Sequence, residues 1–106
     1  KLDGRDLALR LYGIRVDALS EKAARQLGWS RNEGVVLTEV EPNSPASQAG
    51  LQPGDLLYTL GPYRVRGLEQ IGSLLEEVQS GSRAEVGVVR MFRQKARLLE
   101  GELVAR

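Results

Sequence analysis

Apolar and polar positions follow two different periods along the chain, and these periods separate predicted helices from predicted strands. Between residues 68 and 78 the apolar positions are spaced by three and four, which is the clearest helical signal in the sequence. A second amphipathic stretch, residues 18–27, is closed by Gly28, a residue type suited to a left-handed helix cap. We therefore predict one helix over each of these two segments.

Strands are predicted where short runs of β-branched or alternating apolar residues are bounded by turn-forming residues. Residues 7–16 alternate in part and contain one glycine, Gly13, near which we expect the strand to be interrupted. In the first half of this run, Leu7, Leu9 and Leu11 fall on one side, and Ala8, Arg10 and Tyr12 on the other. The other predicted strands are residues 34–40, 55–60, 83–91 and 95–104.

Turn and cap residues punctuate the middle of the chain. Ser44 can cap free backbone amides and Pro45 suits the first position of a helix, so a helix of one or two turns is predicted before Gly50. Residues 52–55 (QPGD) and 61–64 (GPYR) have the composition of tight turns. Strands interrupted by two substantial helices, with hairpin-length links late in the chain, predict an α+β domain on a partly open antiparallel barrel.

Composition and charge narrow the possible functions. A chain of 106 residues fits one hydrophobic core. The net charge is only +1 and the Lys and Arg residues are not clustered in one run, which disfavours a nucleic-acid partner. No apolar stretch is long enough to cross a membrane, and no leader pattern is visible at the start. Without His or Cys the chain lacks the side chains of most hydrolytic and zinc sites, so we expect no enzyme activity, metal or cofactor.

One segment carries a family resemblance. Residues 34–60, GVVLTEVEPNSPASQAGLQPGDLLYTL, resemble the core signature of bacterial PDZ domains, in which a β-branched strand is followed by an SPA-type short helix, an AG pair and a GD turn. The resemblance covers residues 8–104, leaving 1–7 as an N-terminal flank and 105–106 as a tail. It implies a PDZ-like, partly open antiparallel barrel or sandwich of five to six strands with two main helices.

The resemblance extends to a peptide site. Residues 11–14 look like the loop that binds a peptide carboxylate in this family, and residues 68–78 look like the helix on the other side of the peptide groove. The order of these parts is similar to the circularly permuted PDZ domains of HtrA/Deg serine proteases. The implied carboxylate-binding residues are Leu11, Tyr12, Gly13 and Ile14. The implied groove residues are Arg15, Val16, Ile71, Leu74, Leu75 and Val78, with Arg10 as a candidate charge contact.

Alternative readings stay open for several of these residues. A lone glycine such as Gly13 also marks an ordinary strand bulge, and some of the helix residues at 71–78 must belong to the core. Arg10, Arg15, Arg64 and Arg66 also fit solvated surface charges, and Trp29 fits a packing residue near the strand at 34–40. The groove helix has no His, so the implied ligand has an apolar rather than a hydroxyl-bearing recognition residue.

The function implied by the resemblance is capture of hydrophobic C-terminal or extended peptides by strand addition. The domain would serve as a regulatory or substrate-recruiting part of a larger protease, together with its other domains, in the periplasm or another extracytoplasmic compartment. The alternative is a structural or assembly module with an empty groove, or one filled by residues 1–6 or 100–106. The parent could also be a membrane metalloprotease, a processing protease or a secretion component.

Overall fold

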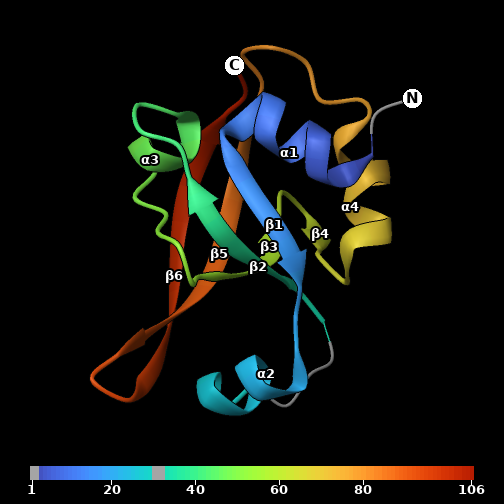
Figure 1. Ribbon diagram of the computed structural model, residues 1–106. Coiled ribbons are helices and arrows are strands. Elements are labelled where there is room, and N and C mark those ends of the chain that lie inside the picture. The colour runs from blue at the N-terminus through green and yellow to red at the C-terminus, as the bar shows by residue number, and fades with distance from the viewer. Residues whose placement is uncertain (1–2, 30–32) are drawn as a thin grey trace.

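The computed structural model describes residues 3–29 and 33–106. Within these residues an antiparallel sheet has the strand order β1-β2-β3-β5-β6, with β4 paired to β3 outside this path (Figure 1). The sheet is open and is accompanied by helices, so the predicted α+β class and the five to six strands are confirmed. The elements are α1 (Gly4–Tyr12), β1 (Ile14–Ala18), α2 (Glu21–Leu27), β2 (Val35–Val40), α3 (Pro45–Gln48), β3 (Leu56–Leu60), β4 (Tyr63–Arg64), α4 (Leu68–Leu75), β5 (Arg83–Phe92) and β6 (Lys95–Val104).

The first half of the strand predicted at residues 7–16 is wrong, because residues 4–12 form α1 and only Ile14–Ala18 are a strand. Asp3 caps α1 by accepting a hydrogen bond from the amide of Asp6, and Gly13 ends it with φ +75°. Leucine, alanine and arginine are good helix formers, and the buried positions Gly4, Ala8 and Leu11 recur at helical spacing. The domain therefore has a further substantial helix beside the two expected.

The remaining helix signals are confirmed. Ser20 caps α2 by accepting from the amide of Ala23, and Gly28 closes it with φ +66°. Ser44 accepts from the amide of Ser47 and Pro45 opens α3, which has the predicted length of about one turn. Strand β4 folds back on β3 as the GPYR turn predicts, and α4 begins at the predicted Leu68.

The main core lies between the sheet and the helices α1 and α4. Buried side chains come from β1, β2, β3, β5 and β6 and from one face of each of these two helices. They include Ala8, Leu11, Ile14, Val16, Val35, Leu37, Leu57, Ile71, Leu75, Val86, Val88 and Leu103. Helix α2 covers a smaller cluster of Leu27, Leu56 and Val89 at the other end of the molecule (Figure 1).

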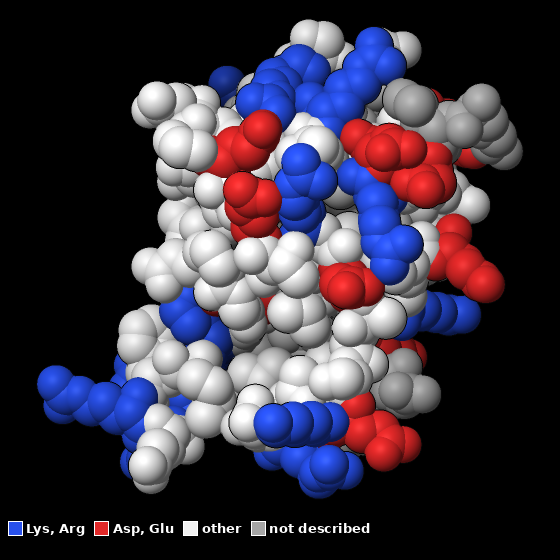
Figure 2. All heavy atoms as spheres, in the orientation of Figure 1, with Lys and Arg blue, Asp and Glu red and all other residues white. Residues whose placement is uncertain are grey.

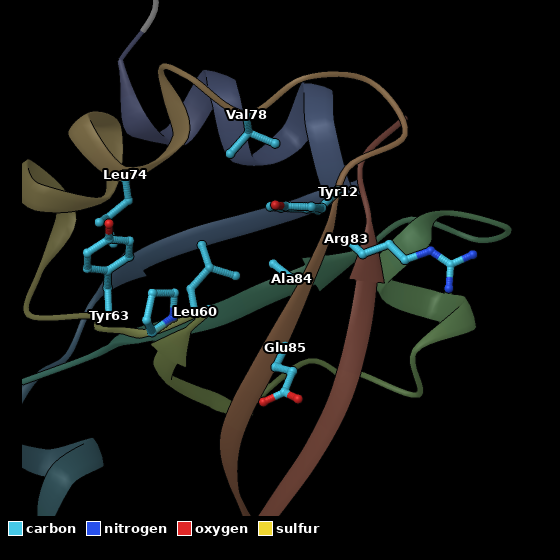
Figure 3. Close-up of a pocket in the computed structure, with 10 residues that line it drawn as sticks. Tyr12, Leu60, Tyr63, Leu74, Val78, Arg83, Ala84 and Glu85 are labelled. Carbon is cyan, nitrogen blue, oxygen red and sulfur yellow. The ribbon is translucent and has the colours of Figure 1, made fainter.

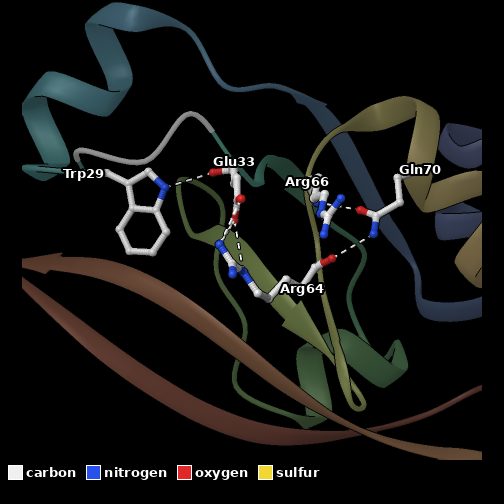
Figure 4. A network of polar contacts seen from close by, with 5 residues as sticks. All are labelled: Trp29, Glu33, Arg64, Arg66 and Gln70. Atoms are coloured by element: carbon white, nitrogen blue, oxygen red, sulfur yellow. Dashed lines mark hydrogen bonds and ion pairs between the residues drawn. The ribbon is translucent and has the colours of Figure 1, made fainter.

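Trp29 packs against that smaller cluster, which confirms its predicted structural role. Its ring centre lies 5.5 Å from that of Tyr58, and its indole N–H donates to the carbonyl of Glu33 at 2.9 Å. The Glu33 carboxylate in turn binds the guanidinium of Arg64, with Nη2–Oε2 at 2.8 Å, and the Gln70 amide bonds to the backbone of Arg64 (Figure 4). These contacts join the start of β2 to β4 and to α4.

A buried ion pair fixes the GD turn. The Asp55 carboxylate is 1% exposed, accepts from the amide of Gln52, and binds the Arg90 guanidinium through Nε at 2.8 Å and Nη2 at 2.7 Å. Arg90 also donates to the carbonyl of Gly50 at 2.7 Å. The hydrogen bonds that Arg90 donates to the Asp55 carboxylate raise the pKa of Arg90 above its ordinary value. The turn after α3 is thus tied to β5.

Replacing Asp55 with Ala should destabilise the domain by about 3 kcal/mol, because the Arg90 charge and the Gln52 amide then lose a buried partner. Glu102→Ala is a suitable control, since its ion pair with Arg83 is 3.4 Å long and exposed, and such pairs contribute about 1 kcal/mol or less. Urea unfolding of both variants measures the difference. Equal losses of stability would contradict the role assigned to Asp55.

The turn between α1 and β1 should be equally sensitive. A side chain at Gly13 would combine an unfavourable positive φ with a Cβ only 2.3 Å from Cβ of Ser44, so Gly13→Ala should cost about 3 kcal/mol. Gly28 also has positive φ, but a Cβ there meets nothing within 4 Å, so Gly28→Ala should cost about 1 kcal/mol. Thermal and urea unfolding compare the two. A Gly13 variant no less stable than the Gly28 variant would show that the contact with Ser44 is dispensable.

Candidate functional site

Strand β1 lies at one edge of the sheet. It pairs antiparallel with β2 from Ile14 opposite Val40 to Ala18 opposite Val35, and the ladder is irregular between Arg15 and Val16. Among the described strands it has no second neighbour. Helix α4 packs beside β1, so the space between β1 and α4 is the candidate groove for an added strand.

Helix α1 lies in that space. Helix α1 packs against both β1 and α4, because the chain reverses direction at Gly13, between the end of α1 and the start of β1 (Figure 1). At the far end of α1, the Nη2 atom of Arg5 lies 2.9 Å from Oδ1 of Asp17 on β1. The amide of Ala18 and the Arg5 guanidinium both bind the Asp17 carboxylate and lower its pKa.

The contact between α1 and α4 is unusually close because two glycines meet there. A Cβ built on Gly4 would lie 2.5 Å from Cγ2 of Ile71 and 2.8 Å from the amide nitrogen of Gly72. A Cβ on Gly72 would lie 3.3 Å from the nitrogen of Gly4. Sequence reasoning missed Gly4 and Gly72, although a glycine inside the amphipathic pattern at residues 68–78 is a signal for close packing.

The four residues with the carboxylate-loop pattern sit at the junction of α1 and β1, and all are buried. Leu11 and Tyr12 end the helix, Gly13 caps it, and Ile14 begins β1. The amide of Gly13 donates to the carbonyl of Leu9 at 3.0 Å, so in this state it closes the helix. The loop is therefore in a helix-terminating conformation here.

Arg106 covers this junction from the end of the chain. Its amide donates to the carbonyl of Leu11 at 3.0 Å, and its guanidinium donates to the carbonyls of Leu9 at 2.8 Å and Arg10 at 3.0 Å. The same guanidinium forms an ion pair with Glu41. Arg106 thus satisfies the last carbonyl groups of α1, whereas the side chain of Arg10 is exposed.

The six groove residues inferred from sequence fall into three environments. Val16, Ile71 and Leu75 are at most 4% exposed and belong to the main core. Arg15 is exposed and pairs with Glu39 at 2.8 Å. Leu74 and Val78 are partly buried and line a pocket together with Tyr12, the last residue of α1. The structure therefore does not bring these six residues together on one open surface.

That pocket is an apolar cavity of about 440 Å³ between the end of α4, the β3–β4 turn and the start of β5. Its lining consists of Tyr12, Leu60, Gly61, Pro62, Tyr63, Leu74, Val78, Arg83, Ala84 and Glu85. Figure 3 shows the Tyr12 side chain extended across the pocket below Val78. Burial of this side chain raises the pKa of the Tyr12 hydroxyl, which stays neutral at physiological pH.

The charges around α1 and β1 are mixed in sign. Figure 2 shows blue and red side chains interspersed over the upper half of this face, and ion pairs join Arg5 to Asp17 and Arg15 to Glu39. Residues 3–29 and 33–106 contain no group of three or more acidic side chains placed to hold a metal ion. No helix in those ranges is long and apolar enough to cross a membrane.

Comparison with known proteins agrees with this architecture. The family model of the PDZ domain matches residues 36–90. The magnetosome formation protease MamE of Paramagnetospirillum magneticum is 34% identical over 76% of this chain and 11% of its own length. A probable periplasmic serine endoprotease, DegP-like, of Chlamydia pneumoniae is 33% identical over 73% of this chain and 16% of its own length.

Two solved structures share the fold. The PDZ domain of HtrA3 bound to the phage-derived ligand FGRWV superposes with a TM-score of 0.68 at 19% identity, covering 90% of this chain and 83% of that one. The HtrA-type protease AlgW with a decapeptide gives 0.67 at 24% identity, covering 91% of this chain and 30% of that one. The chain spans less than a fifth of the two curated relatives above. It belongs to the PDZ domain family, in the form that HtrA- and DegP-type proteases carry.

Proposed function

We propose that this PDZ domain binds the C-terminal or extended segment of another polypeptide by adding it as a strand to β1, in the groove beside α4. The observation that carries the proposal is the edge of β1 next to α4, which has no second partner among the described strands, in a fold whose neighbours include HtrA proteins bound to peptides. Strand addition uses backbone hydrogen bonds for affinity and side-chain pockets for selectivity. The domain needs no catalytic group for this role.

The ligand carboxylate would lie at the loop of Leu11, Tyr12, Gly13 and Ile14. Consecutive backbone amides at a glycine can form a concave anion site, and Gly13 supplies the required freedom. Because the Gly13 amide now donates to the carbonyl of Leu9, the last turn of α1 has to open to release it. Arg10, exposed at that turn, is the candidate charge contact.

The ligand should be apolar at its recognition positions. Arg15 and Val16 would contact it from β1, and Ile71, Leu74, Leu75 and Val78 would supply apolar surface from α4 and the segment after it. A polar recognition residue would lose its hydrogen bonds with water among these side chains and would bind less well. The absence of His from the chain also removes a side chain able to read a ligand hydroxyl.

In the whole protein, we propose that this domain recruits or senses substrates for a serine protease outside the cytoplasm. The support is the set of relatives, which includes proteins named probable periplasmic serine endoprotease DegP-like. One observation favours a second candidate function. Because α1 fills the space between β1 and α4, the domain could instead be an assembly module whose groove stays closed.

An NMR titration with the pentapeptide FGRWV, as the free acid and as the C-terminal amide, tests the proposed function. The free acid should shift the amides of residues 12–17 with a dissociation constant of about 10 μM, equivalent to roughly 7 kcal/mol. Amidation removes the charge and should weaken binding at least about tenfold. A panel of other pentapeptides with apolar C-terminal residues is titrated in the same way, in case the domain prefers a different sequence.

Two results would contradict parts of this proposal. Equal binding of the acid and the amide would exclude recognition of the carboxylate, and shifts confined to residues outside β1 and α4 would exclude strand addition there. Binding confined to the apolar pocket would appear instead at Leu60 and Tyr63.

A further inference from the structure

We propose that α1 is a built-in competitor of the peptide ligand: it occupies the groove between β1 and α4 and has to leave before a strand can add to β1. This inference rests on the proposed function, because it concerns access to the same edge. It makes peptide binding a two-state property of the domain, with a closed state that has α1 docked and an open state that has it released.

Helix α1 has the direction expected of the ligand. Arg5 near the start of α1 lies beside Asp17 near the end of β1, whereas Tyr12 at the end of α1 is joined through Gly13 to Ile14 at the start of β1. Helix α1 therefore runs antiparallel to β1. A peptide whose carboxylate lies at the loop and whose body follows β1 would run the same way. The helix thus has both the position and the polarity of the ligand.

Helix α1 also obstructs the edge of β1 sterically. Ala8 is fully buried and Leu11 is 8% exposed, so the inner face of α1 is part of the main core. The glycine pair Gly4 and Gly72 brings the backbones of α1 and α4 into direct contact. Between α1 and β1 a hollow of about 350 Å³ is lined by Arg5, Leu9 and Asp17, and a strand added about 4.8 Å from β1 would meet α1 there.

The ion pair between the far end of α1 and β1 contributes little to holding the helix in place. The Arg5–Asp17 pair has side chains 56% and 60% exposed, and exposed pairs contribute little to stability. A nine-residue helix is marginal by itself and depends on its packing. Release of α1 leaves the sheet ladder intact, because the strand pairs of β2, β3, β5 and β6 do not involve it.

Because only open molecules bind the peptide, the apparent association constant equals that of the open state multiplied by the fraction of molecules that are open. Substitutions that disfavour docking should therefore strengthen peptide binding, which is the reverse of what a change in a binding site usually does. Gly4→Leu is the most direct such change, because the new Cβ would lie 2.5 Å from Cγ2 of Ile71. The substitution is on α1 and therefore leaves the residues of β1 and α4 unaltered. Gly72→Ala disturbs the same contact from α4, with a Cβ 3.3 Å from the Gly4 nitrogen.

The experiment measures the affinity of the free-acid pentapeptide for the unmodified domain and for three variants by calorimetry. Gly4→Leu should bind roughly tenfold more tightly or better, and Gly72→Ala should change in the same direction by less. The control is Gly67→Ala at the start of α4, where a Cβ meets nothing within 4 Å and the affinity should not change. Hydrogen exchange follows each variant: the amides of residues 7–12 should lose protection in Gly4→Leu while those of β2 and β3 keep it.

The outcomes separate the two proposals. Tighter binding together with released α1 supports the competitor role. Unchanged or weaker binding in variants whose α1 is released, with β2 and β3 still protected, overturns it and leaves the proposed function standing. If α1 is released and no variant binds any peptide of the panel, the proposed function fails and the competitor role fails with it. Rapid exchange of residues 7–12 in the unmodified domain would also overturn the closed state.

Discussion

Gly13 has a left-handed backbone conformation and packs so closely against Ser44 that no side chain would fit between them. The position of α1 follows from this contact. Ser44 is itself fixed, because its hydroxyl donates to the carbonyl of Glu41 and accepts from the amide of Ser47 at the start of α3. The backbone of Glu41 closes the set by donating to the carbonyl of Gly13. The turn therefore joins α1, β1 and α3 at one point and sends α1 back along β1.

The contacts that hold the frame differ in kind from those that hold α1. The frame depends on buried groups, above all the Asp55–Arg90 pair that ties the GD turn to β5. Helix α1 depends on the burial of Ala8, Leu11 and Tyr12, on a close glycine crossing with α4, and on charges that are largely exposed. The free energy of local opening varies across a protein, and elements with fewer buried contacts open before the core does. Opening of α1 without unfolding of the sheet is therefore physically reasonable.

Much of the fold could be predicted from sequence because local signals agreed with it. Ser44 with Pro45 marked α3, Gly28 marked the end of α2, and the apolar stripe marked α4, each through chemistry confined to a few residues. Residues 7–12 were mistaken for a strand because Leu7, Leu9 and Leu11 alternate, while the decisive cap at Asp3 lay outside the alternating run. Alternation over six residues does not distinguish a strand from a helix whose ends are set by caps.

The candidate site was harder to predict than the fold, since it depends on which flank of α4 faces which neighbour. The apolar stripe of α4 is wide enough that Ile71 and Leu75 enter the core while Leu74 faces a separate pocket. The residue that shapes the groove flank, Gly72, has no side chain and so contributes nothing to a hydrophobic pattern. Its meaning depends on Gly4, which is far away in the sequence.

The central claim, that α1 and a peptide exclude one another beside β1, is tested most directly by locating α1 in the presence of ligand. The chain has no Cys, so a single nitroxide can be attached at Asp6→Cys, an exposed position on α1. In the free domain the label should broaden the amide signal of Gly72, and saturation with the free-acid pentapeptide should restore that signal. Persistent broadening of Gly72 in the peptide-saturated domain would contradict the account.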